Sequence, residues 1–188
     1  MLKRIIPFAH ELLTRSVRVG DIVVDATCGN GNDTLVLCGL VGREGHVYAF
    51  DIQKQAIDTT RSLLQDHDFT NVTYIHDSHA KLAQYLPKNL KGKLGGAIFN
   101  LGYLPRSDKK IITKGESTIQ AIETLLEYIR EEALVVIVIY HGHEGGAEEK
   151  EAVLNYVQKL DQKKFAVLKY EFINQKNNPP FVVAIEKL

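Results

Sequence analysis

The sequence lacks the features that mark membrane, secreted and metal-binding proteins. It has no apolar run long enough for a membrane-spanning helix, and residues 1–16 carry charged side chains where a signal peptide has an apolar core. Its two cysteines, Cys28 and Cys38, form no C-x-x-C pair, which argues against a disulfide framework or a cysteine zinc site. We therefore expect a cytoplasmic protein that binds neither a membrane nor a metal ion.

The chain also lacks a net charge. Its 23 basic and 23 acidic residues cancel at neutral pH, so no overall field attracts nucleic acid, and any RNA contact must come from a local basic patch. Internal repeats and low-complexity segments are absent as well. At 188 residues the chain is long enough to bury a hydrophobic core without staples, and we expect residues 1–188 to form a single domain.

What the sequence does contain is an alternation of apolar strands with amphipathic helices. Strands are predicted to start at residue 22 and to span 47–51, 72–76, 96–100, 133–140, 165–172 and 181–186. Helices are predicted over 7–17, 33–41, 54–66, 79–85 and 147–160, with another after a capping box of Ser117 and Gln120. The last two strands leave no room for a helix between them, so they must be antiparallel neighbours. The pattern predicts an α/β fold, a Rossmann-like doubly wound sheet of seven strands, mostly parallel with a C-terminal antiparallel hairpin.

Two glycines one residue apart, Gly29 and Gly31, follow the first strand and precede a helix. Without a Cβ they permit a sharp turn at positive φ and a close approach of a ligand, and the helix offers unpaired N–H groups. The neighbouring Asn30 and Asn32 tolerate left-handed backbone conformations. The dinucleotide fingerprint would place a third glycine at Thr34. This loop predicts a nucleotide site but leaves the kind of nucleotide open.

Polar residues stand where the predicted strands end, which is the edge at which such sheets bind ligands. Asp51 ends the second strand, 20 residues after Gly31, and can accept both ribose hydroxyls of a nucleoside or cap the next helix. Gln53 is then expected to border the adenine. Asp77 and Ser78, after the third strand, suit a contact with the adenine amine, although Ser78 is also a credible helix cap.

Asp25, four residues before Gly29, gives the glycine loop a resemblance to motif I of class I S-adenosylmethionine-dependent methyltransferases. That motif usually has a further glycine at the position of Thr27. Asp25 is expected near the methionine part of the cofactor or holding the loop through its N–H groups. The resemblance implies S-adenosyl-L-methionine bound by Asp25, Thr27, Gly29, Asn30, Gly31, Asn32, Asp33, Asp51, Gln53, Asp77, Ser78 and Asn100.

The segment 100–105, Asn-Leu-Gly-Tyr-Leu-Pro, is similar to the Asn-Pro-Pro-Tyr motif of methyltransferases that act on amino groups. In that motif the Asn amide oxygen and a backbone carbonyl accept hydrogen bonds from the nucleophilic nitrogen, and the aromatic ring stacks on the base. Positive charge moves onto the nitrogen during attack, so aligned acceptors and a π face stabilise the transition state. A strand end with an Asn turn and a buried tyrosine is the alternative.

Two further groups of residues follow strand ends. His141 and His143 flank a glycine, but no third ligand completes a metal cluster, so His141 is expected to contact RNA phosphate or to take a proton. Tyr140, which closes the fifth strand, is expected in the core. Basic side chains after residue 105 form either a solvated loop or a phosphate-binding patch: Arg106, Lys109, Lys110 and Lys114.

Segments 25–34, 50–53, 76–79, 99–105 and 140–143 together resemble a bacterial family long labelled rRNA methylase and now understood as tRNA 5-(aminomethyl)-2-thiouridine methyltransferase. The resemblance implies methyl transfer to the exocyclic aminomethyl nitrogen of this wobble uridine in the tRNA anticodon stem-loop, with Asn100, Tyr103 and His141 catalytic. An rRNA base methyltransferase, a small-molecule amine methyltransferase, a non-catalytic nucleotide-binding module and an NAD enzyme are the alternatives. The oligomeric state stays open, with a homodimer one possibility.

Overall fold

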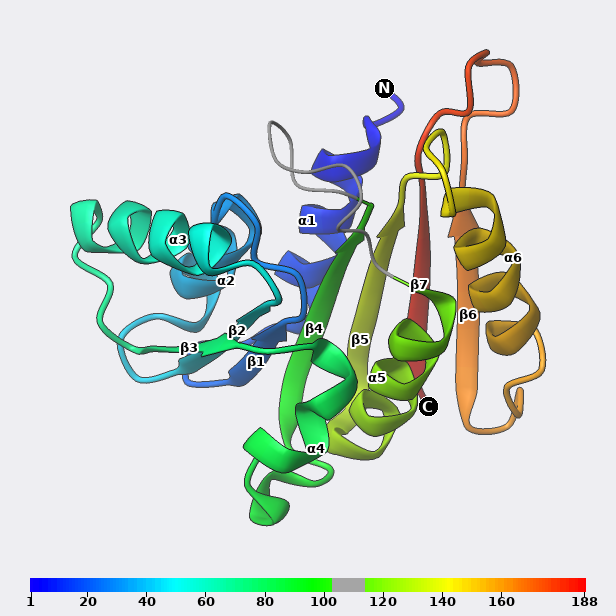
Figure 1. Ribbon diagram of the computed structural model, residues 1–188. Coiled ribbons are helices and arrows are strands. Elements are labelled where there is room, and N and C mark those ends of the chain that lie inside the picture. The colour runs from blue at the N-terminus through cyan, green and yellow to red at the C-terminus, as the bar shows by residue number, and fades with distance from the viewer. Residues whose placement is uncertain (103–113) are drawn as a thin grey trace.

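The computed structural model describes residues 1–102 and 114–188. These residues form one seven-stranded sheet with helices on both faces (Figure 1). The strands are β1 (Ile22–Asp25), β2 (His46–Asp51), β3 (Val72–His76), β4 (Leu94–Leu101), β5 (Ile129–Ile139), β6 (Phe165–Tyr170) and β7 (Phe181–Lys187). The helices are α1 (Ile5–Ser16), α2 (Asn32–Val41), α3 (Lys54–Asp66), α4 (Leu82–Tyr85), α5 (Gly115–Tyr128) and α6 (Gly146–Val157), with the short 3₁₀ helices η1 (His79–Lys81) and η2 (Lys88–Leu90).

The strand order across the sheet is β3-β2-β1-β4-β5-β7-β6. Strands β1 to β5 pair in parallel, whereas β7 is antiparallel to both β5 and β6. This confirms the predicted doubly wound sheet and its antiparallel hairpin. The chain order reverses between β1 and β4, and a crevice at such a reversal is where open α/β sheets bind ligands.

The two faces of the sheet carry separate hydrophobic clusters because side chains alternate along each strand. In β4, Phe99 packs with residues of α4, α5 and α6 on one face, whereas Ile98 packs with residues of α1 and α2 on the other. Both side chains are fully buried, and each such burial contributes roughly 1.5–3 kcal/mol. Figure 1 shows α1 on one side of the sheet and α5 and α6 on the opposite side.

Most element boundaries follow the predicted ones, and the differences have local causes. The predicted capping box of Ser117 and Gln120 is wrong, because α5 starts at Gly115 and its N-cap residue is Lys114. Ser117 lies within the first turn, where its hydroxyl donates to the Lys114 carbonyl. The start of β5 was placed too late, because its first residues are charged and Glu132 takes a positive φ of 63° beside a break in the β4 pairing. Among the described residues, no helix has the length and apolar character needed to cross a membrane.

Candidate active site

The predicted polar residues of four strands meet at one edge of the sheet. Asp25 and Asp51 are the last residues of β1 and β2, Asp77 follows β3, and Asn100 is the penultimate residue of β4. These strands run in parallel, so their carboxyl ends lie together. The sequence-based prediction of their placement is confirmed.

The glycine loop turns at positive φ where the sequence indicated, at Gly29 (52°) and Gly31 (84°). Asn30 and Asn32 do not use the left-handed conformations that they could tolerate, because the glycines take them and Asn32 already begins α2. A Cβ at Gly31 would lie 3.0 Å from the Thr60 Cα. Glycine is therefore required at residue 31 by the packing of α3 as well as by the turn.

Asp25 holds this loop from inside the protein. Its side chain is fully buried, and it accepts hydrogen bonds from the Thr27 N–H at 3.2 Å and the Thr34 hydroxyl at 2.6 Å. Burial, and then the nearby charge of Asp33, raises the pKa of the Asp25 carboxyl well above its usual range. Of the two roles expected for Asp25, the contacts support the one that holds the loop. Thr34, which replaces the third glycine of a dinucleotide site, supplies one of them.

Asp51 connects the end of β2 to the glycine loop. Its two carboxylate oxygens accept from the Gly29 N–H at 3.0 Å and from the Gln53 N–H at 2.9 Å. Gln53, not Asp51, is the N-cap residue of α3, so the helix-capping alternative for Asp51 is wrong, and the bond from the Gln53 N–H closes a turn before the helix. The other bond fixes the loop, and partial burial raises the pKa of Asp51. Asp51 thus stands between the loop and the first turn of α3.

Asp77 is an ionised acceptor at the end of β3. Its pKa is lowered to about 2 by the Lys81 ammonium, then by the Tyr85 hydroxyl and the Ser78 N–H. The ion pair with Lys81 is partly exposed, so it contributes little to stability. Ser78 caps η1 as predicted, since its hydroxyl accepts from the Ala80 N–H.

Asn100 is held through both its backbone and its side chain. Its N–H donates to the Thr27 hydroxyl at 2.7 Å, and its side-chain Nδ2 donates to Asp33 Oδ2 at 3.2 Å. The other oxygen of Asp33 lies 2.6 Å from His10 Nε2 of α1. Threonine at residue 27 therefore provides a bond that the usual glycine cannot. His10 is absent from the predicted site because nothing in the local sequence links it to Asp33, 23 residues away.

The end of β5 differs from the expectation. Tyr140, predicted in the core, is 37% exposed, and its Cβ would be 3.4 Å from a Cβ at Gly102. Its backbone N–H donates to the Leu101 carbonyl at 3.1 Å. An exposed aromatic ring thus stands directly beside the end of β4. The prediction failed because Tyr140 directly follows the apolar run of β5, which resembles core sequence throughout.

His141 and Lys114 lie where the chain leaves the sheet. His141 Nε2 is 3.1 Å from the Pro179 carbonyl, its ring packs beside Phe181, and partial burial lowers its pKa. The described residues show no hydrogen bond between His141 and another predicted site residue. Lys114 is an exposed residue that precedes α5. Tyr103, Arg106, Lys109 and Lys110 lie outside the described residues.

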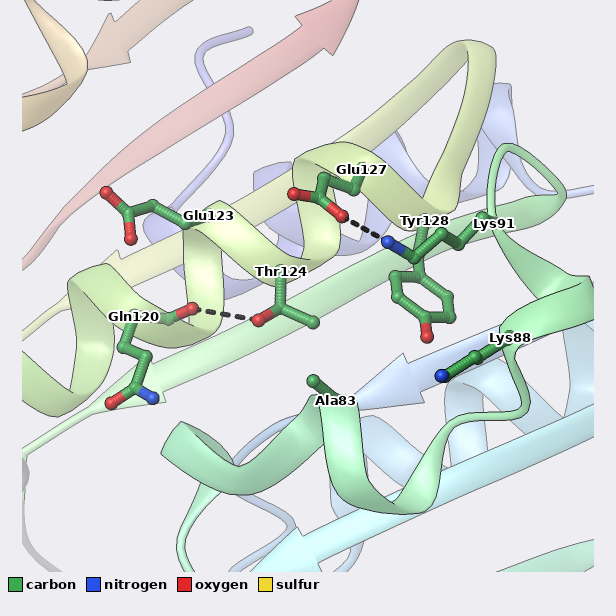
Figure 2. Close-up of a pocket in the computed structure, with 8 residues that line it drawn as sticks. All are labelled: Ala83, Lys88, Lys91, Gln120, Glu123, Thr124, Glu127 and Tyr128. Carbon is green, nitrogen blue, oxygen red and sulfur yellow. Dashed lines mark hydrogen bonds and ion pairs between the residues drawn. The ribbon is translucent and has the colours of Figure 1, made fainter.

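Within the described part of the chain, neither a reactive thiol nor a metal cluster adds to this site. Burial raises the pKa of Cys28 far above its usual range, so its thiol stays protonated and a poor nucleophile. No group of three or more metal-ligating side chains occurs in residues 1–102 and 114–188. A groove elsewhere is lined in part by an ion pair of Lys91 with Glu127, and none of the predicted site residues lines it (Figure 2). Its lining residues are Ala83, Lys88, Lys91, Gln120, Glu123, Thr124, Glu127 and Tyr128.

The strand order, the glycine loop after β1 and the acids at the ends of β1 and β2 define a class I S-adenosylmethionine-dependent methyltransferase. Comparison with known proteins places the chain within this class. Residues 47–186 match the model of the family described as "Putative rRNA methylase", and the chain belongs to that family.

Three relatives cover nearly the whole chain. A chloroplastic tRNA (mnm(5)s(2)U34)-methyltransferase of Arabidopsis thaliana is 34% identical over 98% of this chain and 70% of its own length. The crystal structure of a protein described as a "putative rRNA-methylase" from Clostridium thermocellum superposes with a TM-score of 0.96, at 43% identity and full coverage of both chains. A protein from Streptococcus mutans described as a "putative methyltransferase", in complex with SAH, is 42% identical, with a TM-score of 0.89 and full coverage of both chains. The predicted S-adenosyl-L-methionine cofactor is thereby confirmed.

Proposed function

We propose that the protein methylates the exocyclic aminomethyl nitrogen of 5-aminomethyl-2-thiouridine at the wobble position of tRNA. The observation that carries this proposal is the hydrogen bond that the side-chain NH₂ of Asn100, at the end of β4, donates to Asp33. A carboxylate only accepts hydrogen bonds, so the amide oxygen of Asn100 is left as an acceptor for a substrate amine. The Arabidopsis thaliana relative is a methyltransferase of this tRNA position by name.

The residues around the glycine loop suit the cofactor. S-adenosylmethionine supplies a methyl group on a sulfonium, which is already an activated leaving group. Asp51 would accept from the ribose hydroxyls, and Asp77 with Ser78 would receive the adenine amine. These two carboxylates lie at adjacent strand ends, because β2 and β3 pair in register. The turn at Gly29 and Gly31 would bring backbone N–H groups close to the methionine part.

Positioning supplies most of the rate acceleration in this scheme. The N–C bond forms as the S–C bond breaks, and the amine gives up one proton, which leaves a secondary amine and S-adenosylhomocysteine. Asn100 and the Leu101 carbonyl align the nitrogen and stabilise the positive charge that it gains. The Leu101 carbonyl already accepts one hydrogen bond but has a second lone pair. The proton acceptor is either bulk water or His141, which would act through Nδ1 because its Nε2 lies 3.1 Å from the Pro179 carbonyl.

The substrate half of the proposal depends on residues at the same edge. Tyr103 is assigned to pack against the target base, and Tyr140 adds an exposed ring beside Gly102. Lys114 is assigned to the phosphate backbone of the anticodon stem-loop together with Arg106, Lys109 and Lys110. The description of the family names rRNA instead, so an rRNA base methyltransferase is the second candidate.

Methyl transfer to purified RNA separates these candidates. With labelled S-adenosylmethionine, tRNA from a strain lacking this gene should accept methyl groups, and nucleoside mass spectrometry should show loss of the unmethylated aminomethyl nucleoside. Ribosomal RNA from the same strain should stay unlabelled. Label in ribosomal RNA alone would replace the proposal with the second candidate. Methylation of a free amine, unaffected by charge reversal at Lys109 and Lys110, would indicate a small-molecule enzyme.

Asn100→Ala tests the central residue. We expect a loss of about 100-fold or more in turnover, because an acceptor that acts in the transition state is removed. The affinity for S-adenosylmethionine, measured by calorimetry, should stay near normal. Asn71→Ala, which removes an amide bonded to two loop carbonyls after α2, is a matched control that should retain wild-type turnover. Equal activity of Asn100→Ala and the wild type would contradict the assignment.

A further inference from the structure

Two hydrogen bonds join the first helix to the end of β4 through one carboxylate. Asp33, in the first turn of α2, is 7% exposed and accepts on both of its oxygens. The partners are His10 Nε2 of α1 at 2.6 Å and Asn100 Nδ2 of β4 at 3.2 Å. Three elements distant in the chain therefore meet at Asp33, at the edge of the sheet that holds the candidate active site.

We propose that His10 and Asp33 are positioning residues that set the orientation of the Asn100 amide for methyl transfer. The inference rests on the proposed function, in which the Asn100 oxygen accepts from the substrate amine. Because Asp33 can only accept, it retains the NH₂ edge of the amide and directs the oxygen of Asn100 away from itself.

This orientation matters because an asparagine side chain has two chemically opposite edges. If the amide turned over, Asn100 would present its NH₂ group to the substrate amine, and a donor would face a nitrogen that is gaining positive charge. The backbone of Asn100 is already fixed by its bond to Thr27. Rotation of the side chain is thus the freedom that remains, and the bond to Asp33 removes it.

His10 completes the arrangement by fixing the plane of the Asp33 carboxylate. A carboxylate bonded at one oxygen can still turn about its side chain, whereas bonds to both oxygens hold it. His10 is itself well supported, because Ala9 and Leu13 of the same helix are fully buried against the sheet. The competing explanation is that His10 only ties α1 to α2 and affects stability without acting on Asn100.

Kinetics of His10→Ala distinguish the two explanations. We expect kcat to fall by about 10- to 100-fold, with the calorimetric affinity for S-adenosylmethionine within about twofold of the wild type. His10→Gln should recover most of kcat, because the Gln side chain can place an N–H donor near the same point. Tyr170→Phe is the control: it removes a different bond of the α1 region, from the Tyr170 hydroxyl to the Lys3 carbonyl at 2.8 Å, and should leave kcat unchanged. Wild-type kcat in His10→Ala, or an equal loss in Tyr170→Phe, would overturn the proposal.

A second measurement needs neither substrate nor turnover. The side-chain amide signals of Asn100 in a ¹⁵N–¹H spectrum can be identified by their absence from Asn100→Ala. They should shift or broaden in His10→Ala and return toward the wild-type positions in His10→Gln, and Tyr170→Phe should leave them in place. Unmoved signals in His10→Ala would refute the coupling even if no tRNA is methylated. Conversely, shifted signals with an inactive wild-type enzyme would count against the proposed substrate and not against the positioning role.

Discussion

At the scale of single residues, Asp51 has two roles. Its carboxylate accepts a hydrogen bond from the Gly29 N–H and so holds the glycine loop. In the proposed site it also accepts hydrogen bonds from the ribose hydroxyls of the cofactor. Asp51→Ala should weaken binding of S-adenosylmethionine by about 10- to 100-fold, the range for a lost charged hydrogen bond, with little change of kcat at saturating cofactor. Calorimetric titration measures the affinity, and Asp58→Ala, at an exposed position paired with Lys54, is the control. An affinity unchanged from the wild type would exclude the ribose role.

Asp25 predicts how stability depends on pH. Its folded-state pKa is raised above that of the unfolded chain, mainly by burial and then by the charge of Asp33. The folded protein therefore keeps a proton that the unfolded chain has lost, so the contribution of Asp25 to stability is full below the unfolded pKa and is lost as pH rises through the folded pKa. Asp25→Asn removes this titration, and its free energy of unfolding relative to the wild type should increase between about pH 5 and about pH 8.

Chemical denaturation at several pH values checks this sign. The absolute stability of Asp25→Asn also reflects altered bonds to Thr27 and Thr34, so the change of the difference with pH is the quantity to compare. Asp58→Asn, a substitution at an exposed aspartate, should show no such change. A difference that is constant with pH for Asp25→Asn would mean that Asp25 is ionised throughout.

At the scale of elements, the start of α2 depends on one glycine. Gly31→Ala would place a Cβ at positive φ and 3.0 Å from the Thr60 Cα, which should destabilise the protein by about 1–3 kcal/mol. Gly39→Ala is a matched substitution in the same helix, with nothing within 4 Å of its added Cβ, and should stabilise by up to about 1 kcal/mol. Thermal or chemical unfolding measures both variants, and equal effects would contradict the packing argument.

The elements that the sequence predicts best are those with a local pattern. The boundaries of α3 agree residue for residue, since its buried side chains recur at helical spacing, and β7 is recognisable as an apolar run. The sequence places the start of β5 too late, because Arg130, Glu131 and Glu132 interrupt the apolar pattern where the pairing with β4 is irregular.

In the candidate site, too, the sequence predicts the residues that have a local signal and misses the contacts between distant elements. Asp51 and Asn100 could be placed because each ends a strand. The bond of Asp33 to His10 could not be placed, because it forms between two helices that only the folded sheet brings together. The exposure of Tyr140 could not be predicted either, because it depends on β5 ending at Ile139, at the edge of the folded sheet.

At the scale of the whole molecule, the two ends of the sheet serve different purposes. The carboxyl ends hold the candidate site, whereas at the amino ends Arg130 of β5 donates to the Ser16 carbonyl at 2.6 Å and to Asp21 at 3.2 Å. These partly buried bonds tie the end of α1 and the turn before β1 to the sheet. Arg130 is only 17% exposed in its side chain, so its bonds should contribute measurably to stability.

Arg130→Ala should therefore lower the free energy of unfolding by about 1–3 kcal/mol, the cost of leaving hydrogen-bonding partners without a charged donor. Methyl transfer per folded molecule should not change, because the lost bonds lie at the opposite end of the sheet. Arg15→Ala, at a 73% exposed side chain, should cost about 0.5 kcal/mol or less. Denaturant titration and an activity assay on the same samples check both parts, and a parallel loss of turnover would show that the two ends are coupled.

The position of β7 bears on how the protein folds as it is synthesised. Residues 181–187 are made after the six other strands, yet β7 lies between β5 and β6 and pairs with both. Until these residues leave the ribosome, one edge of β5 has no partner, and an unpaired apolar edge invites association with other chains. β7 is the last strand to be made, so the β5 edge of a nascent chain stays unpaired from the completion of β5 at residue 139 until residues 181–187 are available.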